Sequence, residues 1–73
     1  MNKERRKRIA EAAELIERAA GILEEVSEDE QESYDNLPEG LQSAERGEQM
    51  QENIEILEEF ISNLEEVENL RDI

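Results

Sequence analysis

The sequence YDNLPEGLQSAERGEQM, residues 34–50, separates two long tracts of helix-forming residues. It contains the only proline and the only tyrosine of the 73-residue chain and two of its three glycines. The tracts on either side consist mainly of Glu, Leu, Ile and Ala. Proline and glycine interrupt helices, because proline lacks a backbone N–H and glycine loses more conformational entropy than other residues. The segment therefore predicts a joint between two helices.

The tract before the joint has apolar residues at alternating spacings of three and four, which is typical of a helix that packs along one seam. These residues are Ile9, Ala12, Ile16, Ala19, Leu23 and Val26. Further apolar side chains widen the stripe: Ala13, Leu15, Ala20 and Ile22. We expect the first helix to run from about residue 2 to 28, with residue 31 as an alternative end.

The tract after the joint repeats this pattern with Met50, Ile54, Leu57, Ile61 and Leu64, and Phe60, Val67 and Leu70 widen it. We expect a second helix from about residue 44 to 70, with Ser43 as its N-cap because a serine oxygen can accept from the free amides of the first turn. Two helices of similar length and a joint at about 32–42 predict a single all-α domain, 1–73, folded as an antiparallel two-helix hairpin.

The joint itself has signals of local structure. Asn36, Pro38 and Glu39 resemble the start of a helix, and LPEGLQ would form one short turn that Gly40 ends. Two interpretations remain open. The joint is either a capped connection, or a recognition loop on a helical scaffold. In the second case the partner-binding residues would be Tyr34, Leu41 and Arg46.

The net charge of −14 is unevenly distributed along the chain. Five of the eight basic residues lie in the first eight positions, whereas 21 acids and only three arginines follow from Ile9 onward. In an antiparallel hairpin the basic start of the chain would lie beside the end of the second helix. We expect attraction there to the acids Glu65, Glu66, Glu68 and Asp72.

Glutamates form rows along both predicted helices. The longer row is Glu48, Glu52, Glu55 and Glu59, and the shorter is Glu24, Glu28 and Glu32. Residues three and four apart are neighbours on a helix, and like charges at this spacing destabilise it. DNA is also a rod of regularly spaced negative charge, so an acidic helical rod could occupy a nucleic-acid-binding groove. The alternative is a solvated surface that serves solubility.

Several function classes lack the residues they need. Cysteine and histidine are absent, which removes disulfides, thiolate metal sites and the commonest general base. An EF-hand loop starting at Asp35 would place Leu37 and Arg46 at ligand positions. No carboxylate pair stands out as an acid–base couple. We therefore expect no catalytic activity, no cofactor and no metal site.

The composition also indicates where the chain acts. No apolar run approaches the length of about 18 residues that a membrane span needs, so we expect a cytoplasmic protein without membrane contact. The basic stretch KERRKR, residues 3–8, is one short patch on a strongly acidic chain. Direct binding to nucleic acid is not expected from it, because the net charge repels phosphates.

Two helices alone would leave part of each wide apolar stripe in water, including Leu15, Ile22, Phe60 and Val67. We therefore expect self-association into a homodimeric four-helix bundle. The residues assigned to self-association are Ile16, Leu23, Leu57, Ile61 and Leu64.

Residues 30–50 resemble a pattern in small acidic helical proteins of phages and prophages of Gram-positive bacteria. The resemblance rests on YDNLPE at 34–39 and QSAERGE at 42–48, set between acidic helices. It implies a viral setting, the cytoplasm of a bacterial host, and no named reaction. Two hypotheses follow: an inhibitor that binds a host protein, such as a nucleic-acid-binding or defence enzyme, through DNA-like charge; or an assembly protein that binds itself or another phage protein.

Overall fold

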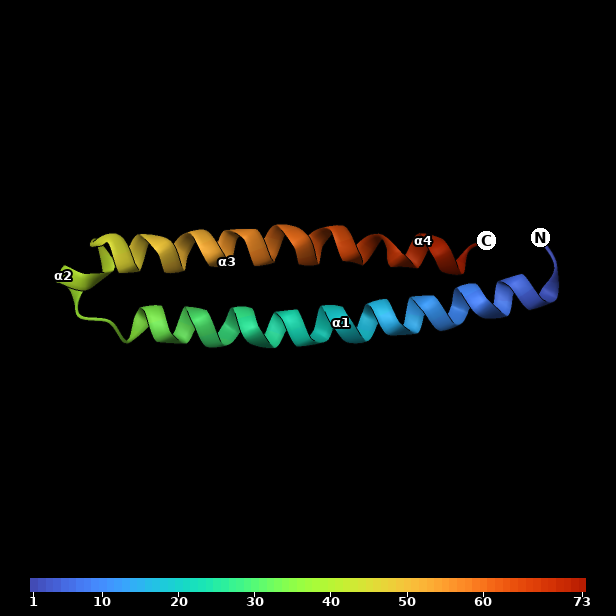
Figure 1. Ribbon diagram of the computed structural model, residues 1–73, viewed down its shortest axis with the longest axis horizontal. Coiled ribbons are helices and arrows are strands. Elements are labelled where there is room, and N and C mark those ends of the chain that lie inside the picture. Colours follow the sequence, from blue (N-terminus) through green and yellow to red (C-terminus); the bar gives the residue numbers. More distant parts are fainter.

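The computed structural model describes all 73 residues and contains helices and no strands, so the all-α prediction is confirmed. The elements in chain order are α1 (Lys3–Asp35), α2 (Glu39–Gln42), α3 (Glu45–Leu64), the 3₁₀ segment η1 (Glu65–Val67) and α4 (Glu68–Arg71). The segment α3–α4 runs back alongside α1, with α2 at one end and both termini at the other (Figure 1). The molecule measures 58 × 14 × 13 Å. None of its helices contains an apolar stretch that could span a lipid bilayer.

Helix α1 begins at an N-cap, where Asn2 Oδ1 accepts a hydrogen bond from the backbone N–H of Arg5 at 2.9 Å. It ends at Asp35, beyond the expected end near residue 28 or 31. Residues 28–33 contain no proline or glycine, so nothing in them stops the helix. The backbone N–H of Asn36 donates to the carbonyl of Glu32, and Pro38 disfavours helical geometry in the residue before it.

The seam of α1 differs from the predicted one. It is formed by the buried or half-buried residues Ile9, Ala13, Ile16, Ala20, Leu23, Ser27, Glu30 and Tyr34, and Gln31 beside it is also half-buried. The prediction was wrong for Ala12, Ala19 and Val26, which are exposed. Both sets alternate spacings of three and four and share every second member, so spacing alone does not separate them. The observed set places small residues of α1 against bulky residues of α3 and η1. Ser27 lies beside Ile61, and Ala20 lies beside Leu64 and Val67.

Helix α3 packs through Ile54, Leu57, Ile61 and Leu64, and the chain then changes its winding. The next inward residues, Val67 and Leu70, follow at spacings of three. A 3₁₀ helix has three residues per turn, so it holds residues at this spacing on one side, whereas an α-helix would turn them away. The short segment η1 therefore interrupts the continuous helix expected over 44–70.

The joint is ordered by hydrogen bonds that differ from those predicted. Ser43 ends α2, and Ala44 takes the N-cap position of α3 without a side-chain bond, so the predicted Ser43 cap was wrong. Gly40 lies inside α2 rather than ending it. Gln42 Nε2 donates to the backbone carbonyl of Tyr34 at 3.1 Å and ties α2 to the end of α1.

The basic start of α1 extends beyond the C-terminus (Figure 1). The attraction expected between residues 3–8 and the acids near the chain end does not take the form of ion pairs. The one ion pair of the structure joins Arg71 Nη2 to Glu17 Oε1 at 2.9 Å, two turns further along α1. The first turns of α1 reach past the residues that were expected to neutralise them.

Candidate functional site: an acidic face and an apolar face

The contact between α1 and α3 has two flanks of opposite character. On one flank the exposed residues are predominantly glutamates, and we call this flank the acidic face. It comprises Glu14, Glu17, Glu24 and Glu28 of α1 with Glu48, Glu55, Glu58 and Glu65 of α3 and η1. These residues lie three, four or seven apart within each helix and therefore share a side.

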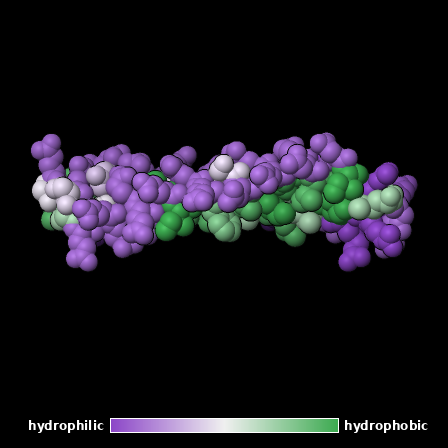
Figure 2. Space-filling view, turned by 90° about the horizontal axis from the view of Figure 1, so that it is seen from above, coloured by the Kyte–Doolittle hydropathy of each residue, from purple (hydrophilic) through white to green (hydrophobic).

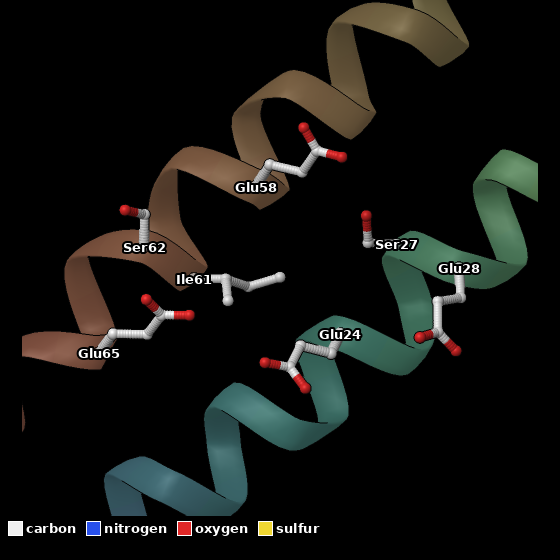
Figure 3. A pocket seen from close by; sticks show the side chains of 7 residues that line it. All are labelled: Glu24, Ser27, Glu28, Glu58, Ile61, Ser62 and Glu65. Atoms are coloured by element: carbon white, nitrogen blue, oxygen red, sulfur yellow. The ribbon is translucent and has the colours of Figure 1, made fainter.

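A shallow groove runs along the middle of the acidic face (Figure 3). Glu24 and Glu28 line it from α1, and Glu58 and Glu65 line it from the opposite helix. Ser27 and Ile61 extend between the two helices and form its floor. None of these four carboxylates has an ion-pair partner, since the single pair of the structure involves Glu17. The groove therefore presents uncompensated negative charge from both helices.

The structure brings together only part of the predicted glutamate rows. Glu24 and Glu28 lie at the groove, and Glu48 and Glu55 lie on the same flank nearer the joint. The remaining predicted residues, Glu32, Glu52 and Glu59, are exposed on the outer edges of their helices. Two groove residues, Glu58 and Glu65, were not assigned to the site from the sequence. The sequence could have indicated them, because each directly follows a seam residue, Leu57 or Leu64.

The predicted joint residues do not form one surface. Tyr34 is half-buried and continues the α1 seam, so it contributes to packing. Leu41 and Arg46 are exposed, and Arg46 has no ion-pair partner. These positions show Tyr34 in a structural role and leave Leu41 and Arg46 free to contact another molecule.

The residues assigned to self-association lie inside the helix pair. Ile61 is buried, and Ile16, Leu23, Leu57 and Leu64 are half-buried between α1 and α3 of the same chain. They are used for folding and offer little surface to a second copy. The large exposed apolar side chains of α1 and α3 are different ones: Leu15, Ile22, Val26, Ile56 and Phe60.

These exposed residues define the flank opposite the groove, which we call the apolar face. It comprises Ala12, Leu15, Ala19, Ile22 and Val26 of α1 with Gln49, Asn53, Ile56, Phe60 and Asn63 of α3. A hydrogen bond from Asn53 to Glu30 and the closeness of Asn63 to Ile16 place the two sets on the same side. Figure 2, seen from the α3 side, shows hydrophobic residues along the middle part of the lower edge of the rod, between hydrophilic ends, and hydrophilic residues along the upper edge.

The site offers charge and apolar area rather than reactive groups. No group of acidic side chains is arranged to hold a metal ion. Comparison with known protein families, curated protein sequences and solved structures finds no match to this chain. The two faces are therefore the features of this chain that can bind another molecule.

Proposed function

We propose that this protein binds a host protein through its acidic face and inhibits it by occupying a surface that normally holds nucleic acid. The chain would act as an antiparallel hairpin of fixed shape. The observation that supports this proposal is the groove, which carboxylates of two helices line without a basic partner. A surface meant only for solubility has no need of this arrangement, because scattered charges of both signs achieve solubility.

The charge density of the rod supports this proposal. Fourteen net negative charges along 58 Å amount to one per about 4 Å, and one strand of B-DNA carries one per about 3.4 Å. A basic groove that neutralises phosphates would therefore meet a field similar to that of one strand and weaker than that of a duplex, whose two strands carry one charge per about 1.7 Å. Such a field also accelerates association with a basic partner and makes it sensitive to salt.

The resemblance of residues 30–50 to small acidic phage proteins supports a setting in which the target is a bacterial host protein, such as a nucleic-acid-binding or defence enzyme. Leu41 and Arg46 are exposed at the joint end of the rod. They would add contacts that do not depend on negative charge and so distinguish one basic target from another.

The proposal is tested by capture from a lysate of a Gram-positive bacterium on the immobilised chain, with elution by salt steps and by double-stranded DNA. We expect the immobilised chain to capture a nucleic-acid-binding protein, and double-stranded DNA to elute that protein. Replacing Glu24, Glu28, Glu55 and Glu58 by Gln should reduce its retention at least tenfold, because these residues lie on the acidic face.

A matched variant replaces Glu11, Glu25, Glu52 and Glu59, which are exposed on the outer edges, and changes the net charge equally. It should retain the partner within about threefold, because removing distant exposed charges weakens a screened interaction only slightly. Equal loss in both variants would show that only total charge matters. Unchanged retention in the first variant, or no DNA-displaced protein, would contradict the proposal.

The apolar face favours a second candidate, an assembly protein that acts through helical self-association or by binding another phage protein. In that case substitutions on the apolar face would abolish the function, and the Glu-to-Gln variants would leave it intact. The two candidates therefore differ in which face carries the activity.

A further inference from the structure

The ten residues that define the apolar face include no charged side chain, although 22 of the 73 residues are acidic. The half-buried Glu30 accepts a hydrogen bond from Asn53 at the joint end of this face. All ten positions that define it, from Ala12 to Val26 and from Gln49 to Asn63, are apolar or carry a neutral amide. The outer edges and the acidic face of the same helices are densely charged. Exposed Leu15 and Phe60 retain 62% and 57% of their surface in contact with water. A contiguous apolar surface with a polar surround is typical of a protein–protein contact.

The exposed surface of the chain is large for its mass. The structure exposes 5848 Å², whereas a folded monomer of 8.5 kDa is expected to expose about 4,700 Å². The excess of about 1,200 Å² is comparable to the area of about 800 Å² that each partner buries in a standard interface. Only four apolar side chains are buried within the chain: Ala13, Ile54, Ile61 and Val67. A second layer of helices would complete a core that one helix pair leaves open.

We propose that a second copy of this chain covers the α1 part of the apolar face, with the two long axes antiparallel and the two-fold axis passing beside Ala19. Ala19 is the central residue of the α1 part of this face, since Ala12 and Val26 lie seven residues to either side.

In this arrangement α1 packs on α1 of the second copy, with Leu15 against the second copy's Ile22. Ala20 lies beside Leu64 and Val67, so the axis passes near the end of α3, and the face residues 49–56 extend beyond the contact. The product is an antiparallel dimer joined through its two α1 helices, with both acidic faces directed outward.

Charge complementarity selects the antiparallel direction. The side of α1 that carries the apolar face begins with Arg5 and Arg8, which lie beside Ala12 in a groove at the start of the helix. It ends with Asp29 and Ser33, which follow Val26 at helical spacing. The two-fold rotation beside Ala19 brings Arg8 to the level of Asp29 of the second copy. It brings Arg5 to the level of Ser33 of the second copy. The overhanging basic residues, which lack ion pairs within the chain, then meet the acidic joint end of the partner.

A parallel arrangement lacks this complementarity. It would place the basic starts of both copies at the same end and the acidic joints together at the other. Like charges brought together across an interface are unfavourable, and they select against the wrong partner orientation. This dimer does not depend on the proposed inhibitory function, since it uses the opposite face.

Single cysteines test the orientation directly, because the chain has none of its own. Facing helices in close contact bring residues at the two-fold axis within the Cα separation of about 4.4–6.8 Å that a disulfide requires. We expect Ala19→Cys to form a disulfide-linked dimer on mild oxidation. Ala12→Cys alone should form less than one tenth as much. An equimolar mixture of Ala12→Cys and Val26→Cys should form the mixed dimer.

Sedimentation equilibrium tests the face itself. The unmodified chain should sediment at twice its mass of 8.5 kDa. Ile22→Glu should weaken the dimer at least a hundredfold, because it buries a charge in the apolar contact. Ser62→Glu adds the same charge to α3 on the groove side and should leave the dimer intact, and circular dichroism checks that both variants remain helical.

Three results would overturn the proposal. They are a monomeric unmodified chain, an Ile22→Glu variant that dimerises as well as Ser62→Glu, and self-linking of Ala12→Cys as efficient as that of Ala19→Cys. The last result would indicate a parallel pair, and the first would leave the apolar face to another partner.

Discussion

Gly47, in the first turn of α3, lies directly against the backbone carbonyl of Gln42, the last residue of α2. A Cβ atom at position 47 would overlap that carbonyl oxygen. Gly47 is also buried, whereas Gly21 and Gly40 are exposed and have no atom near the place of a Cβ. The close approach at Gly47 lets the chain turn from α2 into α3 within a few residues. This contact determines how the second helix leaves the joint.

Gly47→Ala should destabilise the protein by about 1–3 kcal/mol, because the added methyl group must displace backbone atoms. Gly21→Ala is the matched substitution, and it should stabilise α1 by about 0.5–1 kcal/mol, since alanine is the better helix former and meets open space. Urea unfolding followed by circular dichroism measures both. Equal effects of the two substitutions would contradict the role of Gly47 in the joint.

The glycine in the joint could be seen in the sequence, but its contact could not. Composition and spacing predicted two helical tracts and an interruption near Pro38, because these depend on local backbone preferences. The choice between the Ala13 and Ala12 seams depends on which side chains interlock with α3. That is a tertiary property, and local spacing does not contain it. The assignment of Ile16 and Ile61 to self-association failed to anticipate their use within the chain for the same reason.

The candidate site, like the fold, could be predicted only where local helix geometry determines it. Exposed glutamates were predictable from their number and helical spacing, and Glu24 and Glu28 do line the groove. The participation of Glu58 and Glu65 depends on the seam and on the facing helix. Once the seam is known, the residues directly after Leu57 and Leu64 lie on the groove flank by helix geometry alone.

The hydrogen bond from Gln42 to the carbonyl of Tyr34 is part-buried and holds the joint against α1. Gln42→Ala should cost about 1 kcal/mol of unfolding free energy. Gln49→Ala removes a similar amide bond, to Asn53, from an exposed helix surface and should change the stability by less than about 0.5 kcal/mol. Chemical denaturation of both variants gives the comparison. A Gln42→Ala variant as stable as Gln49→Ala would show that the joint does not need this bond.

The 3₁₀ segment η1 should become α-helical if one residue is inserted into it. An alanine inserted between Glu66 and Val67 places the following inward residue four positions after Leu64, as an α-helix requires. Four α-helical residues at about 1.5 Å and three 3₁₀ residues at about 2.0 Å both advance about 6 Å. The insertion should therefore keep the pair between Arg71 and Glu17 in register.

NMR measures this outcome through amide–amide and Cα–amide contacts, which distinguish i+3 from i+4 spacing. We expect α-helical contacts through residues 64–68 and a thermal midpoint equal to or above that of the parent. Inserting the alanine between Asn53 and Ile54 is the control, since it shifts Ile54, Leu57 and Ile61 out of phase and should destabilise the fold strongly. Persistence of the 3₁₀ segment after the first insertion would mean that residue spacing does not cause it.

Salt should stabilise this protein, in contrast to proteins held by surface ion pairs. The chain carries −14 and a single ion pair, so repulsion dominates and is stronger in the folded rod than in the expanded unfolded chain. Raising NaCl from about 20 mM to about 500 mM shortens the screening length from about 20 Å to about 4 Å. We expect the thermal midpoint at constant protein concentration to rise by about 4–8 °C for each kcal/mol of repulsion that is removed.

Replacing Glu24, Glu28, Glu58 and Glu65 by Gln should raise the midpoint at low salt and reduce its further increase with NaCl. A midpoint that falls as NaCl is added would show that attractive pairs outweigh the repulsion between the two helices.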